Sequence, residues 1–308
     1  MQASKFQLRK TFEYLKKKRI SLIVGLIVTT LSVVGFNFRG SYYFVIPIEC
    51  LNSYQIPCTS IEIEGNKYQV EIDLGSKTAI SLDKKVLGKI DKKQCGTSRR
   101  IDFRGNEYET STYFIPKTKV GTLSAKHIKA REESVEFTTK NAIILETKEN
   151  RCEGRIGRDF FHGKNIFMDF GRYTFIACSQ LKNLEKEGYK SKDFLATPFK
   201  DTANGIILEI ETDLGKQKFI FDTGTSISVI RPQELGADNQ KQKNGIPIIE
   251  TSKFIIDGIN FGSRELYLLD ITQAFDGIDG ILGMDFLKEH PVYLDFAKHT
   301  AYIGNALD

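Results

Sequence analysis

The apolar positions of this chain predict strands far more often than helices. Short runs rich in β-branched and aromatic residues, bounded by glycine, asparagine or aspartate, recur along the sequence, and such runs are typical of β-sheets. The clearest of them lie at 42–48, 67–72, 217–221 and 252–257. Helical periodicity is scarce, so only short helices are expected. Candidate helical segments are 83–90, 232–236 and 285–289. The pattern therefore predicts an all-β protein.

This pattern occurs twice. Residues 154–174 align without gaps on residues 280–300, and seven positions are identical. Upstream, 61–82 matches 207–230 as an alternating strand, a glycine-containing turn, a second strand, and then Asp-x-Gly followed by Ser or Thr. Self-similarity over so long a period indicates two duplicated units.

The duplication sets the expected domains. We expect one lobe at 39–180 and a second at 205–308. The segment 181–204 between them is charged and lacks a sustained apolar period, so it is expected to be a linker, with a strand near 194–198. A chain of 308 residues that is 41% hydrophobic and 27% charged can bury the cores of two lobes, and this composition excludes a disordered or fibrous protein.

The N-terminal segment has the pattern of a membrane signal. Positions 1–19 hold seven basic residues and one acidic residue, Glu13, whereas no charged residue occurs from 20 to 36. The uncharged stretch approaches the roughly 20 residues that a membrane-spanning helix needs. We expect 1–19 to be a basic cytoplasmic tail and 20–38 a transmembrane signal-anchor. A cleaved signal peptide and a buried core helix are the alternatives.

The charge distribution fixes the expected location. By the positive-inside rule the basic tail stays in the cytoplasm, so both lobes are expected on the other side, in a periplasmic, lumenal or extracellular compartment. The chain is then a single-pass membrane protein that contacts lipid through 20–38. Its net charge of +5 comes from 44 basic and 39 acidic residues. Because the tail carries seven of those basic residues, the lobes are nearly neutral and no nucleic-acid partner is expected.

Cysteine and histidine usage predicts no metal centre. No C-x-x-C occurs, and the four histidines lack the spacing of metal ligands, so neither a metal nor a cofactor is expected. An oxidising compartment would permit up to two disulfides, whose connectivity the sequence leaves open. The five cysteines all belong to the first expected lobe: Cys50, Cys58, Cys95, Cys152 and Cys178.

A carboxylate ends a buried strand in each duplicated unit. In FIFDTGTSISVI the apolar strand ends at Asp222, and a second Asp-x-Gly-Ser string, which begins at Asp73, stands in the matching place of the first unit. A carboxylate held at the mouth of an apolar core is costly unless something uses it. Downstream, the second unit has Ile-Leu-Gly at 281–283, and the first unit has Arg-Ile-Gly at 155–157.

These features together resemble the retropepsin and pepsin group of aspartic proteases. Asp-Thr-Gly at 222–224 is similar to the catalytic signature of that family, and 281–283 is similar to its hydrophobic-hydrophobic-glycine element. The resemblance implies two pseudo-symmetric retropepsin-like β-barrel lobes in a pepsin-like bilobal arrangement, with Asp73 and Asp222 facing each other as the catalytic pair. The residues that it implies to support the site are Gly75, Ser76, Thr223, Gly224, Thr225, Gly157 and Gly283.

The chemistry implied by the resemblance is hydrolysis of a peptide bond. Two carboxylates a few ångströms apart cannot both ionise easily, so the pair keeps one proton over a broad acidic range. One carboxylate then activates a water while the other donates to the carbonyl of a polypeptide substrate. The resemblance also implies that the hydroxyls of Ser76 and Thr225 donate to the outer carboxylate oxygens.

Two positions depart from the family pattern. Leu74 replaces a threonine, so the hydroxyl bonds that lock the two aspartate loops together are expected only from Thr223. Arg155 stands where an apolar residue is expected, which indicates an altered loop beside the first aspartate. Two alternatives to a fused endopeptidase therefore stay open. One is a catalytically inactive, pepsin-like binding module, and the other is a homodimer in which second lobes supply Asp222 twice.

Two hairpins are candidates for a flap over the site. In the first unit 99–113 reads as a hairpin with a turn at 104–106, and in the second unit 243–251 contains Asn-Gly at 244–245, a strong tight-turn pair. The first unit is longer, since 84 residues separate its aspartate from the later glycine, against 61 in the second unit. We expect the longer hairpin to be the working flap, with one of two tyrosines near the cleft: Tyr108 or Tyr113.

Overall fold

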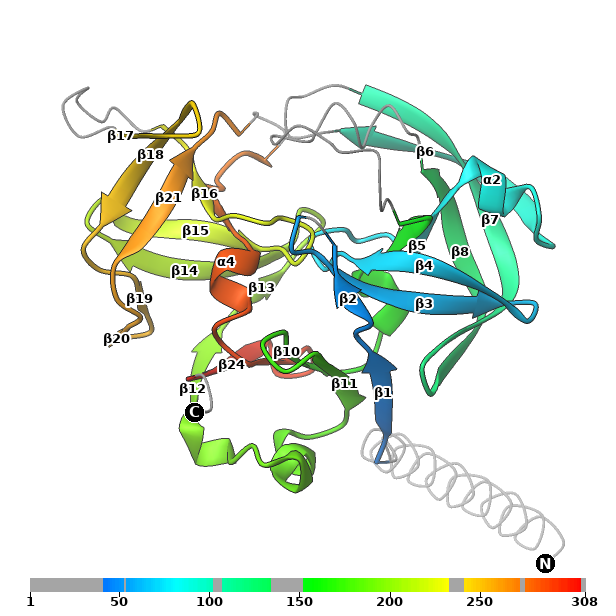
Figure 1. Ribbon diagram of the computed structural model, residues 1–308, viewed down its shortest axis with the longest axis horizontal. Coiled ribbons are helices and arrows are strands. Elements are labelled where there is room, and N and C mark those ends of the chain that lie inside the picture. The colour runs from blue at the N-terminus through cyan, green and yellow to red at the C-terminus, as the bar shows by residue number, and fades with distance from the viewer. Residues whose placement is uncertain are drawn as a thin grey trace, which may run out of the picture. The chain divides into compact units, whose positions relative to one another are not determined.

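The apolar runs of the sequence form the strands of three sheets (Figure 1). Every second residue of β14 (Ile206–Thr212) is buried, because successive side chains of a strand point to opposite faces and one face lies on a core. The helices of the described residues are short: α2 (Lys84–Leu87), α4 (Met284–Leu287), and the 3₁₀ helices η1 (Arg158–Phe161), η2 (Leu181–Glu187) and η3 (Ser191–Asp193). The expected all-β class is confirmed for this part of the chain.

The computed structural model describes residues 41–305 except 53, 102–106, 134–151, 233–240 and 272–274. Its strands belong to one compact unit, Tyr42–Asp308. The predicted basic tail, the predicted anchor and most of the helix expected at 232–236 lie outside the described residues. Within those residues, no helix combines the length and the apolar character that a bilayer crossing requires.

The first lobe is an eight-stranded sheet that closes on itself. Its strand order is β2-β3-β4-β9-β5-β8-β7-β6, and β3 also pairs with β7, where Ile61 lies opposite Val120. Closure into a barrel satisfies backbone groups that would otherwise form an open edge. The strands are β2 (Cys50–Leu51), β3 (Pro57–Ile63), β4 (Asn66–Ile72), β5 (Ile80–Asp83), β6 (Lys93–Ile101), β7 (Glu107–Val120), β8 (Leu123–Glu133) and β9 (Gly154–Ile156).

The second lobe repeats this topology in a ten-stranded sheet. Its order β14-β15-β22-β16-β21-β18-β17 corresponds strand by strand to β3-β4-β9-β5-β8-β7-β6 of the first lobe. Strands β15 and β22 are parallel, as are β4 and β9. The strands are β13 (Lys200–Asp201), β14, β15 (Gly215–Phe221), β16 (Val229–Ile230), β17 (Lys241–Lys243), β18 (Ile246–Thr251), β19 (Ile255–Ile256), β20 (Ile259–Asn260), β21 (Arg264–Leu268) and β22 (Gly280–Leu282).

A third sheet of six strands joins the lobes, and the sequence pattern did not predict it. Its order is β1-β11-β10-β23-β24-β12, so each repeat contributes three strands. Phe167 lies opposite its own duplicate, Tyr293, in the central pair, which places the pseudo-twofold axis between them. The strands are β1 (Tyr43–Pro47), β10 (Ile166–Asp169), β11 (Thr174–Cys178), β12 (Phe194–Pro198), β23 (Val292–Asp295) and β24 (Thr300–Gly304).

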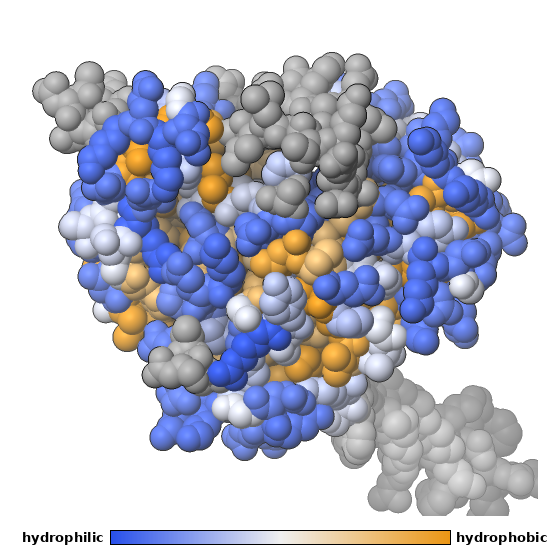
Figure 2. All heavy atoms as spheres, viewed as in Figure 1, coloured by the Kyte–Doolittle hydropathy of each residue, from blue (hydrophilic) through white to orange (hydrophobic). Residues whose placement is uncertain are grey.

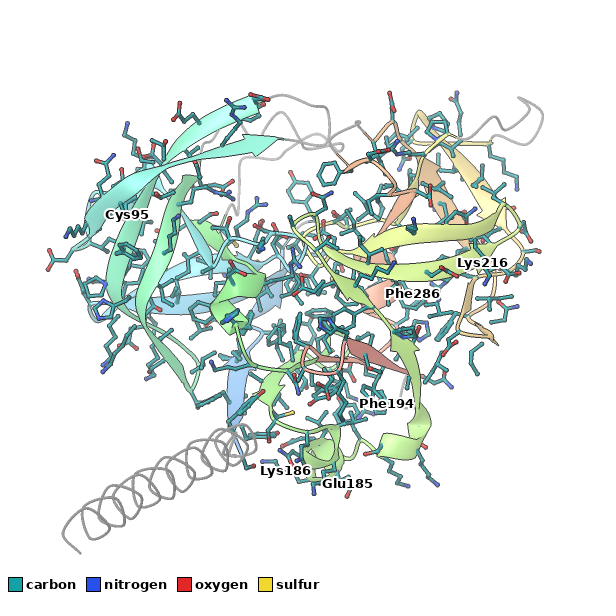
Figure 3. The ribbon with its side chains drawn as sticks, turned by 180° about the vertical axis from the view of Figure 1, so that it is seen from behind. Cys95, Glu185, Lys186, Phe194, Lys216 and Phe286 are labelled. Carbon is teal, nitrogen blue, oxygen red and sulfur yellow. The ribbon has the colours of Figure 1, made fainter. Side chains whose placement is uncertain are left out.

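The segment expected to be a linker contains ordered structure. It holds η2, η3, β12 and β13, and β12 is the strand expected near 194–198. Phe194 lies at the start of this strand (Figure 3), 6.4 Å from the rings of both Phe167 and Tyr189. These aromatic contacts fix the segment against the six-stranded sheet.

The lobes share one apolar core. A single cluster of buried side chains includes Ile61 of the first lobe and Phe219 of the second. On the face drawn in Figure 2, hydrophilic residues predominate at the two flanks and hydrophobic residues gather between them. Asp169 and Asp295 occupy equivalent positions in the two repeats. Each accepts a hydrogen bond of 3.1 Å from the backbone N–H three residues later, which belongs to Arg172 for Asp169 and to Lys298 for Asp295. Their identity between the repeats therefore reflects turn formation.

Two of the cysteines lie in direct contact. The Sγ atoms of Cys58 and Cys152 are 3.1 Å apart and both side chains are buried. Cys50 lies opposite Cys58 on the neighbouring strand, and Cys95 is exposed on β6 at the outer side of the first lobe (Figure 3).

We expect mild oxidation to join Cys58 to Cys152. Glutathione disulfide accepts the two electrons while the thiols lose their protons, and these two sulfur atoms already touch. Peptide mapping by mass spectrometry after alkylation should show this cross-link, and Cys152→Ser should remove it. A dominant cross-link between Cys50 and Cys58 would contradict the expectation, and exposed Cys95 serves as the unpaired reference.

Candidate active site

The two aspartates occupy equivalent positions in the two lobes. Asp73 follows β4 and Asp222 follows β15. The N–H of Asp73 donates to the carbonyl of Ile156 at 2.9 Å, and the N–H of Asp222 donates to the carbonyl of Leu282 at 3.0 Å. Each aspartate is thus held by the parallel strand beside it, so the duplication reproduces the backbone of the site.

Two glycines allow each aspartate loop to pass close to the next strand. A Cβ on Gly157 would lie 2.5 Å from the carbonyl oxygen of Ser76, and a Cβ on Gly283 would lie 2.8 Å from that of Thr225. Real Cβ atoms do not approach backbone so closely, so only glycine fits at these positions. Both predicted glycines therefore lie where an aspartate loop packs against its neighbouring strand.

The carboxylates of Asp73 and Asp222 face the same small space. A Cβ placed on Gly224 would lie 2.8 Å from Oδ1 of Asp73 and 3.2 Å from Oδ1 of Asp222. A Cβ placed on Gly75 would lie 2.3 Å from Oδ1 of Asp222. The glycine of each loop therefore packs against the carboxylate of the opposite lobe. Any side chain there would push the two carboxylates apart.

Asp222 accepts the hydroxyl hydrogen bond that the resemblance implied, and a backbone one as well. The Thr225 hydroxyl donates to its Oδ2 at 2.7 Å, and the N–H of Gly224 donates to its Oδ1 at 2.8 Å. Burial, together with the charge of Asp73, raises the pKa of Asp222 to about 7, although these two donors oppose the shift. The charged form of Asp222 is therefore disfavoured at this site.

Asp73 is held differently, which corrects one expectation. The hydroxyl of Ser76 was expected to donate to Asp73, but the bond comes from the backbone N–H of Ser76, to Oδ1 at 2.9 Å. The other oxygen, Oδ2, accepts from Nη1 of Arg155 at 2.9 Å. A guanidinium thus donates to Asp73, whereas Asp222 accepts from the hydroxyl of Thr225. Arg155, noted in the sequence only as a departure, contacts the candidate dyad directly.

Arg155 lies among three carboxylates. Besides Asp73, its Nη2 is 3.5 Å from Glu71 and its Nε is 4.0 Å from Glu133. Burial opposes the charge on this guanidinium, but Glu133, Glu71 and Asp73 outweigh burial and raise the pKa of Arg155 above its ordinary value. The sequence analysis missed both glutamates. For Glu71 the signal was its two-residue spacing from Asp73, which directs both side chains to the same side of the chain. No such spacing relates Glu133 to Asp73.

The clasp between the two aspartate loops is one-sided, as the sequence predicted. The hydroxyl of Thr223 donates to the carbonyl of Ile72 at 2.7 Å and accepts from the N–H of Leu74 at 2.9 Å. Both Thr223 and Leu74 are fully buried. One hydroxyl therefore satisfies two backbone groups of the other lobe, and Leu74 returns no hydroxyl bond.

A serine and an aspartate support the second loop and were also missed. The Ser228 hydroxyl donates to Asp285 at 2.7 Å and accepts from the N–H of Gly283 at 3.1 Å. Burial raises the pKa of Asp285 above its ordinary value. The signal was Asp285 within the repeat, next to an otherwise apolar run.

The two predicted hairpins occupy equivalent positions. β6 and β7 form the first hairpin, longer than the expected 99–113, and its expected turn at 104–106 lies outside the described residues. β17 and β18 form the second, and its Asn244 and Gly245 both have positive φ, as a tight turn requires. The working flap stays a prediction.

The two candidate flap tyrosines both lie on β7. Tyr108 is opposite Arg100 near the end of the hairpin. Tyr113 packs against the core with the Lys92 ammonium 5.6 Å from its ring centre. Neither position tests whether one of them contacts a substrate.

In the described residues no group of His, Cys, Asp or Glu is arranged to hold a metal ion.

Comparison with solved structures identifies the fold. The aspartic proteinase from Irpex lacteus superposes with a TM-score of 0.56 at 13% identity, over 86% of this chain and 98% of that one. The basic 7S globulin from soybean also gives 0.56, at 11% identity, over 86% of this chain and 95% of that one. The pepsin-like bilobal fold is therefore confirmed.

Comparison by sequence gives no match to this chain. No family model matches the chain, and a search of curated proteins found no significant match. Identities of this size show the fold alone. One of the two structures is described as a proteinase and the other as a globulin, so function has to be argued from the site.

We expect Thr223→Val to destabilise the protein by about 2 kcal/mol or more, because it leaves one buried N–H and one buried carbonyl without a partner. Urea unfolding should measure the loss. Thr223→Ser is the matched control, since it keeps the hydroxyl and should cost less. Equal free energies of unfolding for the two variants would contradict a clasp made by the hydroxyl.

We expect Asp222 to make stability depend on pH. Its pKa is raised from 3.8 to about 7 in the folded protein, so its contribution is fully present below about pH 4 and is lost as the pH rises through about 7. The free energy of unfolding of the wild type, minus that of Asp222→Asn, should therefore fall over this range. A difference that stays constant with pH would contradict the assignment.

Proposed function

We propose that this protein is an aspartic endopeptidase that hydrolyses polypeptides through Asp73 and Asp222. The observation that carries the proposal is the shared space of the two carboxylates, one from each duplicated lobe. Oδ1 of Asp73 and Oδ1 of Asp222 lie 2.8 and 3.2 Å from one point beside the backbone of Gly224, so the two carboxylates are close neighbours, and the charge of Asp73 contributes to the raised pKa of Asp222. A raised pKa on one carboxylate of such a pair is the condition that acid–base catalysis needs.

The dyad supplies both proton transfers of peptide hydrolysis. The ionised carboxylate removes a proton from water as the water attacks the carbonyl carbon, and the protonated carboxylate donates to the carbonyl oxygen. The tetrahedral intermediate then collapses as the amine leaves with a proton from the dyad. Because one chain brings both carboxylates together, this proposal needs no second copy of the protein.

The predicted anchor belongs to the same proposal. Residues 20–38 would tether the hydrolase to a membrane, with the lobes on the side opposite the basic residues 1–19. Substrates would then be polypeptides in that compartment or the exposed parts of neighbouring membrane proteins.

A second candidate function is binding of polypeptide without cleavage. The observation that favours it is the ion pair between Asp73 and Arg155, since a guanidinium on a dyad carboxylate competes with water for that oxygen. The globulin among the similar structures shows that the fold is not confined to proteins described as proteinases.

Hydrolysis of a peptide library separates the two functions. We expect the wild type to cleave peptides, and Asp73→Asn and Asp222→Asn each to lower kcat by about 100-fold to about 10,000-fold, because each removes one proton-transfer group. The double variant should be little worse than either single variant, because the two groups act as a unit. Asp159→Asn, an exposed aspartate of the same repeat, should leave the rate unchanged.

Other outcomes would assign other functions. Retained activity in Asp73→Asn, with loss in Asp222→Asn, would indicate a homodimeric site. A wild type that binds a statine-type transition-state mimic or a peptide but cleaves none, at any acidic or neutral pH, would indicate the binding module.

A further inference from the structure

The two lobes differ in one row of side chains beside the dyad. The row crosses four neighbouring strands, and its members lie directly opposite one another in register. In the second lobe, on β15, β22, β16 and β21, the row is Ile220, Ile281, Val229 and Tyr267. In the first lobe, on β4, β9, β5 and β8, the matching row is Glu71, Arg155, Ser81 and Arg131.

This exchange turns an apolar row into a charged one that leads to Asp73. Opposed residues of neighbouring strands share a face of the sheet, and Glu71 lies two residues before Asp73, so their side chains point to the same side. In the second lobe Ile220 and Val229 are buried and offer no charge to Asp222. The two carboxylates of the dyad therefore have different electrostatic surroundings.

The charged row is built as a supported network. Asn52 donates to Glu71 at 3.0 Å, and Arg131 donates to the buried hydroxyl of Ser81 at 3.3 Å. The side chains of Arg155 and Asp73 are only 16% and 8% exposed, so water screens their attraction little. An arginine fixed in this way donates with a set direction.

Several charged side chains surround Asp73. Arg155 of β9 is in contact with it at 2.9 Å. The carboxylates of Glu71 on β4 and Glu133 on β8 approach the other two nitrogens of the same guanidinium, Nη2 and Nε, and Asp222 faces Asp73 across the dyad. The cation of Arg155 thus touches Asp73, while Asp222 accepts from neutral donors, the Thr225 hydroxyl and the Gly224 N–H.

We propose that Arg155 is a positioning residue that keeps the negative charge of the dyad on Asp73, so that Asp73 is the general base and Asp222 the general acid. This inference rests on the proposed peptidase function and adds fixed roles to it. In a symmetric pair, by contrast, either carboxylate can hold the proton.

The fixed roles give a balanced reaction. Asp73 takes one proton from water as the water oxygen bonds to the carbonyl carbon, and Asp222 gives its proton to the carbonyl oxygen, which yields a neutral gem-diol. Asp73 then gives its proton to the leaving nitrogen, Asp222 takes one back from a diol hydroxyl, and the C–N bond breaks. The products are a carboxylic acid and an amine, and the dyad returns to its starting state.

The test is the pH dependence of kcat/KM for peptide cleavage by the full chain. In Arg155→Leu the acid limb of the profile should move upward by about one to three pH units, because the neighbouring cation no longer stabilises the ionised base. Arg155→Lys should recover most of the wild-type profile, since it restores the charge. Arg158→Leu is the matched control, because that buried arginine pairs with Asp201 instead, and its acid limb should not move.

A second variant guards against loss of folding. Arg155→Leu removes the guanidinium beside Glu71 and Glu133. In Glu71→Ile with Arg155→Ile, these two positions carry the isoleucines of the second lobe, and this double variant should show the same shift. Profiles of both variants that superimpose on the wild type would overturn the inference and leave the peptidase intact. A wild type that cleaves no peptide would overturn the peptidase and this inference together.

Discussion

Two carboxylates that share one small space constrain the rest of this structure. Like charges so close resist joint ionisation, so the site exists only if the protein forces them together and supplies donors that compensate. Gly75 and Gly224 allow the approach, and Gly157 and Gly283 let each loop pass its neighbouring strand. The buried Thr223 hydroxyl ties the loops across the lobe boundary. The six-stranded sheet holds the lobes in the register that these contacts need.

Duplication explains the geometry, and divergence explains the electrostatics. The two lobes repeat each other in strand order and in the backbone bond that holds each aspartate. They differ where Glu71 and Arg155 replace Ile220 and Ile281. The first lobe has the same backbone at its site as the second, but it has a charged group beside its carboxylate. The protein therefore has the dyad, but the surroundings of the two carboxylates differ.

Sequence reasoning reached the features that depend on short patterns. The Asp-x-Gly strings, the glycines of the later strand, the one-sided clasp implied by Leu74 and the strand near 194–198 each follow from a few neighbouring residues. The six-stranded sheet could not be predicted from short patterns. Its central pair is β10 and β23, with Phe167 opposite Tyr293, and these two strands have similar patterns but are far apart in the chain. The role of Arg155 needed the register of β4 against β9, which a single sequence does not fix. The expected hydrogen bond from the Ser76 hydroxyl to Asp73 was wrong: Asp73 accepts from the backbone N–H of Ser76 and from Arg155.

The central claim is that the two lobes hold one proton between a pair of carboxylates. Neutron diffraction from crystals of the lobes, grown at mildly acidic pH in heavy water, tests it most directly because deuterium positions are seen. The account predicts one deuteron on Asp222, none on Asp73, and a water within hydrogen-bonding distance of both. Two ionised carboxylates, two protonated ones, or carboxylates too far apart to share a water would contradict it.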